Sequence, residues 1–313
     1  FIKDLVSVRM KAEHDKIINT IKSAEESMLE VGIVAVGDIS NTSITFQLKN
    51  KSDLQYHTFI EAYDLFELNT DKVWNMAKEL KETLQLNNRN SKCSISPHAP
   101  YSVTPHLFQK INANKPSIIT IHNQETASEN TLFETGTGDL KNFFELSGNK
   151  LPHIKPNGKS SIQNYVPWLN LCDEIIFVHN TFSSDDDIRY AIANTKKCWW
   201  CLCPNANLYI ENTLPEIERI TKATENILIG TDSLASNNQL SILSELKIIT
   251  KKFPQISLHQ LLTWSTINGA KALKMDSELG TLEKGKKPGL VLIENVDLQN
   301  QKITESSQSK RVA

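Results

Sequence analysis

Three short apolar runs in the sequence each end in a residue that can bind a metal ion or move a proton. The run Ile-Ile-Thr-Ile-His ends at His122, and Glu125 follows three positions later. The run Ile-Ile-Phe-Val-His ends at His179, and Ile-Leu-Ile-Gly-Thr-Asp ends at Asp232. Runs of β-branched residues are typical of strands buried on both faces of a parallel sheet. Two imidazoles and a carboxylate at the ends of such strands are suitable ligands for a divalent metal on the rim of a barrel.

Each of these residues also has a simpler interpretation. His179 can end its strand without further function, and Glu125 can be a solvated carboxylate of a loop. Asp232 can cap the helix that follows it, because Asp is a common residue at a helix start. A fourth run, Cys-Ser-Ile-Ser-Pro-His, ends at His98, which is either a substrate contact or a loop histidine with local hydrogen bonds. The alternatives stay open at the level of single residues, and the recurrence of the pattern favours a site.

The elements that must position these side chains alternate along the chain. Apolar runs that predict strands begin near residues 32, 55, 93, 117, 174, 198 and 226, and helical patterns separate most of them. Repeated β-α units indicate a parallel sheet, either doubly wound or closed into a barrel. No G-x-G-x-x-G or P-loop sequence supports a nucleotide-binding open sheet. Since polar residues end at least four strands, we predict an α/β fold with a TIM-type (β/α)8 barrel.

Both ends of the chain modify this prediction. The chain starts at Phe1 inside a helical pattern and supplies one strand fewer than a barrel needs, so we expect the first barrel strand to be missing from this chain. We assign residues 1–279 to the barrel. Residues 280–313 begin with a turn-rich stretch that leads into a strand, which we interpret as the remnant of a small β domain. We expect the polar residues after Asp297 to fray.

Composition narrows the class of protein. The 313 residues carry 34 basic and 36 acidic side chains, a net charge of −2, which gives no electrostatic support for a nucleic-acid or acidic-membrane partner. No apolar run approaches the roughly 20 residues of a membrane helix. Five cysteines, three of them crowded at Cys198, Cys201 and Cys203, suit free thiols in a reducing cytoplasm. We therefore predict a cytoplasmic enzyme with a small-molecule substrate.

Several longer motifs resemble those of one family. They lie in the order that the family has them, and they are residues 96–103 (Ser-Pro-His-Ala-Pro-Tyr-Ser-Val), 122–125 (His-Asn-Gln-Glu), 178–180 (Val-His-Asn), 203–207 (Cys-Pro-Asn-Ala-Asn), 230–233 (Gly-Thr-Asp-Ser), 263–273 (Thr-Trp-Ser-Thr-Ile-Asn-Gly-Ala-Lys-Ala-Leu) and 280–289 (Gly-Thr-Leu-Glu-Lys-Gly-Lys-Lys-Pro-Gly). Together they resemble the amidohydrolase superfamily, in its branch of deaminases and chlorohydrolases that act on nucleosides, purines and triazines. The resemblance covers nearly the whole chain.

The resemblance implies a reaction and a set of roles. It implies a metal-dependent aminohydrolase that deaminates a nucleoside, purine or related nitrogen heterocycle. His122 and Asp232 would bind one divalent metal, with zinc the expected ion and iron the alternative. The metal would lower the pKa of its bound water to about 7, giving a hydroxide that attacks the ring. Asp232 would accept the proton of the water, Glu125 would protonate a ring nitrogen, and His179 would orient the hydroxide or stabilise the oxyanion.

The resemblance also implies substrate contacts at His98, His179, Asn207 and Ser233. One family feature is absent from the sequence, because members carry a His-x-His pair at the end of the first strand and no His-x-His occurs in the 313 residues. The alternatives are therefore a chlorohydrolase or cyclic-amide hydrolase of the same fold, or a non-catalytic relative without metal. A homodimer is the assembly that we consider, because dimers are common in such folds.

Overall fold

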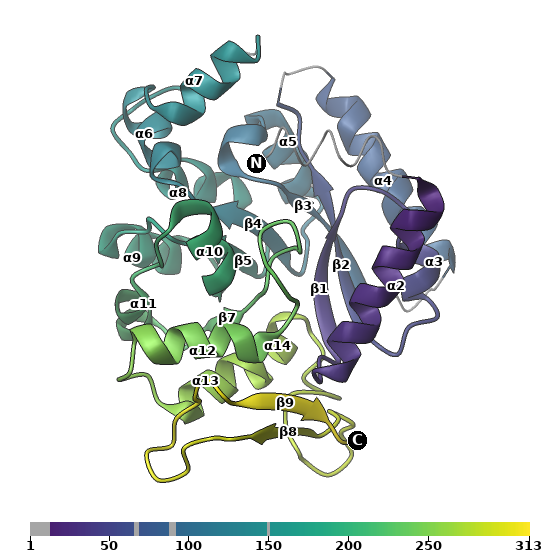
Figure 1. Ribbon diagram of the computed structural model, residues 1–313. Coiled ribbons are helices and arrows are strands. Elements are labelled where there is room, and N and C mark those ends of the chain that lie inside the picture. Colours follow the sequence, from purple (N-terminus) through teal and green to yellow (C-terminus); the bar gives the residue numbers. More distant parts are fainter. Residues whose placement is uncertain (1–12, 66–68, 88–91, 149–150) are drawn as a thin grey trace.

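The structure is a computed structural model that describes residues 13–65, 69–87, 92–148 and 151–313. Its centre is a wall of parallel strands with helices packed outside it (Figure 1). The strands follow one another in space as in sequence, in two sheets of order β1-β2-β3 and β4-β5-β6-β7. They are β1 (Ala35–Ser40), β2 (Gln55–Ala62), β3 (Lys92–Pro97), β4 (Ile119–Asn123), β5 (Ile175–His179), β6 (Cys198–Leu202) and β7 (Ile227–Ile229).

The two sheets meet between β3 and β4. The backbone N–H of His122 donates to the carbonyl oxygen of His98 at 2.9 Å, and the backbone N–H of Thr120 donates to the hydroxyl of Ser96 at 3.2 Å. These hydrogen bonds link the sheet that ends with β3 to the sheet that begins with β4. The predicted strands are therefore present as parallel strands of an α/β fold, whereas a first strand outside this chain stays a prediction.

Most of the helices lie between strands in sequence. In chain order they are α2 (His14–Glu30), α3 (Phe46–Lys49), α4 (Thr70–Asn87), α5 (Pro105–Ala113), α6 (Ala127–Thr135), α7 (Asp139–Leu146), α8 (Ser161–Tyr165), α9 (Asp185–Asn194), α10 (Pro204–Glu211), α11 (Ile217–Ala223), α12 (Ile242–Lys252), α13 (Leu258–Ser265) and α14 (Ile267–Ala272), with short 3₁₀ turns η1 (Pro100–Ser102) and η2 (Val166–Leu169). The sequence missed α6 and α10. α13 and α14 follow each other directly and are divided at Thr266.

Strands β4 to β7 are buried on both faces, whereas β1 is partly exposed, and the buried strands contribute to two apolar layers. On β6, Trp200 faces an outer layer shared with the helices, whereas Trp199 and Cys201 face an inner layer. The inner layer also contains Phe59 of β2 and Leu228 of β7. Side chains from distant strands thus fill one interior, as expected when a parallel sheet curves around a core.

The amino end of β5 carries a buried carboxylate. Glu174 is 8% exposed, and the indole Nε1–H of Trp199 donates to its Oε2 at 2.6 Å. The ammonium groups of Lys197, at 3.4 Å, and of Lys274 pair with its Oε1. A buried charge is tolerated only when it is paired, and here it receives an indole and two lysines.

The C-terminal segment forms a small antiparallel sheet beside the C-terminus in Figure 1, in which β8 (Val291–Glu294) pairs with β9 (Gln308–Arg311). The expected fraying after Asp297 is wrong for β9. Its sequence is polar, but pairing with β8 satisfies its backbone, and Ser307 is fully buried and donates to the carbonyl of Asn295 at 3.0 Å. The boundary at residue 280 stays a prediction.

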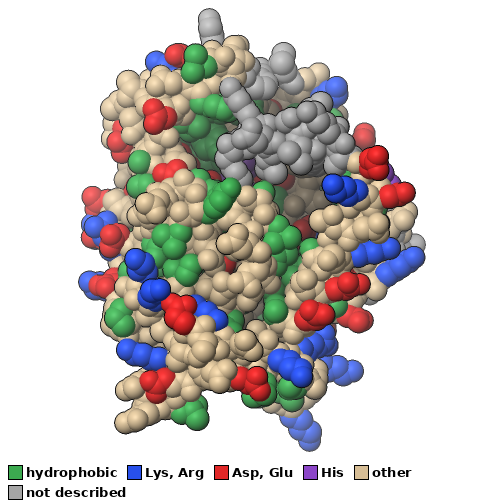
Figure 2. Space-filling view, in the orientation of Figure 1, with side chains coloured by type: hydrophobic (Ala, Val, Ile, Leu, Met, Phe, Trp, Pro, Cys, Tyr) green, Lys and Arg blue, Asp and Glu red, His purple; other side chains and the backbone are tan. Residues whose placement is uncertain are grey.

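Two further findings concern the environment of the chain. All five cysteines are free thiols, and four of them are buried. Within the described ranges, no helix has both the length and the apolar character needed to cross a bilayer. On the face drawn in Figure 2, acidic and basic side chains lie interspersed.

Candidate functional site

Three imidazoles meet at the carboxyl ends of β3, β4 and β5. The ring centroid of His122 lies 5.5 Å from that of His179, with the planes stacked at 22°, and 5.0 Å from that of His98. The parallel arrangement explains this convergence, because each histidine ends or follows its strand and neighbouring strands end at the same edge. The sequence-based grouping of His122 with His179 and His98 is thus reproduced in space.

The ring of His122 is fixed by its backbone neighbour. Its Nδ1 lies 2.8 Å from the carbonyl oxygen of His98, which can only accept, so Nδ1 carries the proton of the neutral ring and Nε2 is left with a lone pair. Burial lowers the pKa of His122, but the charges of Glu125, Glu61 and Asp232 and the bond to His98 outweigh it, and the net pKa is raised. The surroundings that stabilise a proton on this ring would equally stabilise a metal cation.

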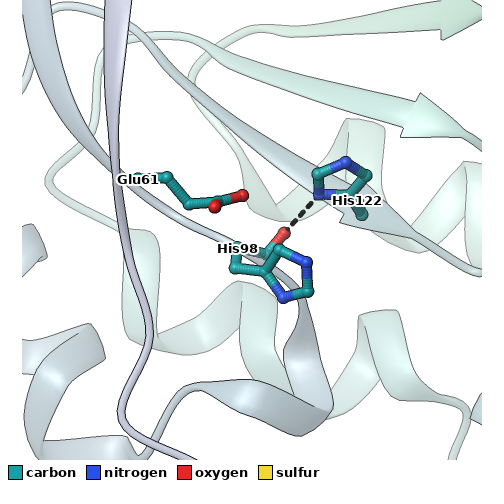
Figure 3. A group of neighbouring side chains, drawn as sticks. All are labelled: Glu61, His98 and His122. Carbon is teal, nitrogen blue, oxygen red and sulfur yellow. Dashed lines mark hydrogen bonds between the residues drawn. The ribbon is translucent and has the colours of Figure 1, made fainter. Parts of the chain in front are cut away.

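Glu61 is a site residue that the sequence analysis missed. It lies in β2, and its carboxylate faces the rings of His98 and His122 (Figure 3). One potential ligand atom from each of the three residues lies within 4.8 Å of the other two. Asn41 supports it, because its Nδ2 donates to Oε2 of Glu61 at 3.1 Å. The signal was its position, since Glu61 closes a predicted strand as His122 and His179 close theirs.

His179 links the predicted acid with a helix behind it. It is 1% exposed, and its Nε2 lies 3.5 Å from Oε1 of Glu125. Its Nδ1 lies 3.3 Å from Oδ1 of Asn207, which is on α10 and is also 1% exposed. The amide of Asn207 further donates to the hydroxyl of Thr181. Asn207 is therefore held between two protein groups, and in this structure it orients His179.

His98 faces both the site and an aromatic pair. Its Nδ1 lies 2.7 Å from the hydroxyl of Ser102, and the rings of Tyr63 and Tyr101 lie 5.8 Å and 6.1 Å away. Burial, with a smaller effect from His122, lowers the pKa of His98 to about 3. The imidazole is therefore neutral and available to a substrate as a hydrogen-bonding group.

Asp232 and Ser233 follow β7. Asp232 accepts a hydrogen bond from the hydroxyl of Ser236, and its charge is one of those that raise the pKa of His122. It does not cap a helix, because the next helix, α12, begins at Ile242. Ser233 is exposed, and its hydroxyl accepts from the backbone N–H of Ala235 at 3.2 Å. The charge of Asp232 thus contributes to the raised pKa of His122, whereas Ser233 forms the outer part of this loop.

The backbone at these strand ends is strained. Positive φ angles occur at Gln124 (46°), His179 (76°), Asn180 (60°) and Asp232 (54°). A non-glycine residue in this region costs about 1–3 kcal/mol and persists only where the surrounding structure holds it. Such residues concentrate at active sites. Four of the ten non-glycine residues with positive φ in the described part of the chain thus lie at these strand ends.

The donor set fits a divalent metal. Within the part of the chain that the structure describes, the group with three closely spaced ligand atoms is Glu61, His98 and His122, and Asp232 is not in it. Imidazole nitrogen and carboxylate oxygen are ligands that zinc and iron accept. The Nδ1–H of His122 donates to a backbone carbonyl, which fixes the ring and leaves Nε2 free. Metal-binding histidines usually have such a bond at their other nitrogen.

Comparison with known proteins extends this result. Residues 6–313 match the model of the amidohydrolase family. An adenosine deaminase of Helicobacter pylori is 28% identical over 280 residues, which are 86% of this chain and 66% of that protein. A 5-methylthioadenosine/S-adenosylhomocysteine deaminase of Moorella thermoacetica is 28% identical over 211 residues, 64% of this chain and 44% of that protein. The chain thus spans less than two thirds of these relatives.

Solved structures give the same picture. The aminofutalosine deaminase of Helicobacter pylori superposes with a TM-score of 0.74 at 26% identity, over 87% of this chain and 68% of that one. An adenosine deaminase from Xanthomonas campestris with bound zinc has a TM-score of 0.69 at 21% identity, over 93% of this chain and 64% of that one, which supports the fold alone. With the family match over residues 6–313, these likenesses identify the chain as a member of the amidohydrolase family.

Proposed function

We propose that the protein is a metal-dependent aminohydrolase that hydrolyses the exocyclic amine of a nucleoside, purine or related nitrogen heterocycle. The observation that carries the proposal is the convergence of His122, His179 and Glu125, with the two rings 5.5 Å apart and Glu125 3.5 Å from His179. The named activities of relatives support it, because they include adenosine, 5-methylthioadenosine/S-adenosylhomocysteine and 5'-deoxyadenosine deaminases. The seven parallel strands support a TIM-type barrel as the scaffold.

One divalent metal is part of the proposal, with zinc the expected ion and iron the alternative. His122 through Nε2 and Asp232 would hold it, and Glu61 and His98 offer further ligand atoms beside His122. When bound, such a metal supplies Lewis-acid activation of water. The Xanthomonas campestris neighbour is a structure with bound zinc.

The side chains of the chain divide the proton transfers. Hydrolysis of an aromatic amine adds water at the carbon, and the amine leaves as ammonia. Asp232 accepts a proton from the attacking water and passes it to the leaving amine, and Glu125 donates one to the ring nitrogen beside that carbon and regains one from the new hydroxyl group as the carbonyl forms. Transfers of this kind contribute roughly 10²–10⁴-fold to the rate. His179 donates its Nδ1–H to Oδ1 of Asn207, so Nε2 of the neutral ring is an acceptor that would orient the attacking water.

The remaining residues concern binding and partners. We infer that neutral His98 contacts the substrate and that Ser233 does so from the outer loop. Asn207 takes part through His179. A heterocyclic small molecule is the proposed partner, with no nucleic acid and no membrane, and the net charge of −2 supports this. A homodimer and a cytoplasmic location are also proposed, the latter supported by five free thiols.

Ammonia release tests the proposal. The purified protein, supplied with zinc, is assayed against adenosine-like nucleosides, guanine, cytosine and triazines, with Glu125→Gln as the matched variant. We expect release from at least one purine nucleoside, and loss of turnover in Glu125→Gln with metal content unchanged. Equal turnover in Glu125→Gln would refute the acid role, and no release from any compound would refute the aminohydrolase.

A second candidate is favoured by one observation, which is the absence of a His-x-His pair from the 313 residues. It is a non-catalytic relative that binds a heterocycle without metal. Metal analysis separates the two candidates, because the enzyme retains about one zinc per chain after dialysis and the non-catalytic relative retains none. A chlorohydrolase or cyclic-amide hydrolase would instead release chloride or open a ring in the same panel.

A further inference from the structure

Glu129 is a buried acid that the proposed reaction does not use. It lies in the first turn of α6, is 1% exposed, and forms no salt bridge among the described residues. Burial raises its pKa to about 7, with a further contribution from the charge of Glu125. Placing a carboxyl group in such surroundings costs free energy unless its hydrogen bonds compensate. The position of those bonds therefore indicates what the residue does.

The bonds of Glu129 reach the residue immediately before Glu125. Its Oε1 accepts the backbone N–H of Gln124 at 2.9 Å and the hydroxyl of Ser161. Gln124 has a φ of 46°, a region that a residue with a side chain rarely adopts. The carboxylate therefore holds the backbone of Gln124 in the strained turn from which Glu125 emerges.

The rest of Gln124 is also fixed, from the side of α9. Its Nε2 donates to Oδ2 of Asp187 at 3.0 Å, and its Oε1 accepts the hydroxyl of Ser183 at 2.6 Å. Its backbone carbonyl accepts the N–H of Phe182 at 3.0 Å. Nε2 also donates to Oδ1 of Asn130 at 3.0 Å, so the side chain and carbonyl have partners of their own and the bond to Glu129 is the restraint on the N–H of this residue.

We propose that Glu129 is a positioning residue for Glu125, holding the Gln124 turn so that the Glu125 carboxylate stays beside His179. This inference rests on the proposed function and adds a residue to it. A displacement of about 1 Å of a catalytic group can cost about 100-fold in rate. Loss of the restraint should therefore lower kcat while leaving substrate binding and metal content unchanged.

The test compares two substitutions of Glu129 whose side chains are similar in length to that of glutamate. Glu129→Gln keeps an acceptor for the Gln124 N–H, whereas Glu129→Met fills the same space without one. We expect Glu129→Met to lower kcat about 10–100-fold with KM within about twofold, and Glu129→Gln to stay within about threefold of the wild type. Glu134→Gln, an exposed position on the same helix, is the control and should change nothing.

Several outcomes would overturn the inference. They are an unchanged kcat in Glu129→Met, an equal loss in both variants, or a loss that follows metal content. If Glu129→Met does not fold, Ser161→Ala removes one partner of the carboxylate and should lower kcat alone; an unchanged kcat then overturns the inference. Glu125→Gln is assayed in parallel. If Glu125→Gln retains turnover, the proposed function fails. If Glu125→Gln is inactive while Glu129→Met is as active as the wild type, only the role of Glu129 fails.

Discussion

Replacing Glu174 by methionine should destabilise the protein at the amino end of β5. The carboxylate is 8% exposed and accepts the Nε1–H of Trp199, which is itself 1% exposed. Methionine has a similar length but no strong acceptor. The substitution therefore leaves a buried indole N–H without a partner, and it leaves Lys197 and Lys274 without their shared carboxylate.

The magnitude follows from these contacts. An unpaired buried donor costs about 1–3 kcal/mol. The lysine side chains are 40% and 39% exposed, so solvent screens both ion pairs and each contributes about 0–1 kcal/mol. The expected loss in the free energy of unfolding is therefore about 1–5 kcal/mol for Glu174→Met. Glutamine keeps the acceptor for Trp199 and loses only the charge shared by the two lysines, so Glu174→Gln should lose about 0–2 kcal/mol.

Urea denaturation followed by tryptophan fluorescence measures this difference. Asp173→Asn is the matched control, because Asp173 is adjacent in sequence, exposed, and paired with exposed Lys196. It should leave the urea midpoint where it is. The reasoning is refuted if Glu174→Met lies within about 0.5 kcal/mol of the wild type, the range of an ordinary surface substitution, or if Glu174→Gln loses as much as Glu174→Met.

Two further predictions concern buried polar residues. Asn207→Ala removes the acceptor of His179 and should lower kcat about 10–100-fold with metal retained, and an unchanged kcat in steady-state assays would contradict its orienting role. Burial lowers the pKa of His57 from 6.5 to about 4, so its contribution to stability is complete above pH 6.5 and is lost as the pH falls toward 4. At 1.36 kcal/mol per pH unit this loss is about 3 kcal/mol. Urea midpoints between pH 7.5 and 4 should show a shallower decline in His57→Asn, and identical pH profiles would exclude this residue as the cause.

The strands were predictable because their signal is local. A run such as that of β4 combines β-branched residues with a polar end, and a parallel sheet then brings such ends together. The cluster of His98, His122 and His179 follows from this rule. Glu61 was missed, although the same rule applies to it because it lies near the end of β2.

The helices that were missed have weak local signals. α6 (Ala127–Thr135) is mostly polar, and its buried face includes Glu129, which a hydrophobic pattern does not reveal. α10 starts at Pro204, directly after a buried strand, and its proline is tolerated because the first helical position needs no N–H donor. β9 is polar and exists through pairing with β8, which only the tertiary structure supplies.

His122 bonds twice to the carbonyl oxygen of His98, and this affects which substitutions the protein can tolerate at residue 122. Its backbone N–H joins the two sheets whatever side chain is present, but its ring adds a second bond to the same carbonyl of His98. A substitution of His122 therefore removes a hydrogen bond at the junction of the two sheets as well as any catalytic role of the ring. The bond between the His122 ring and the His98 carbonyl stabilises the junction of the sheets, so this histidine would contribute to stability even in a relative without catalytic activity. Its retention in a sequence is therefore no proof of turnover.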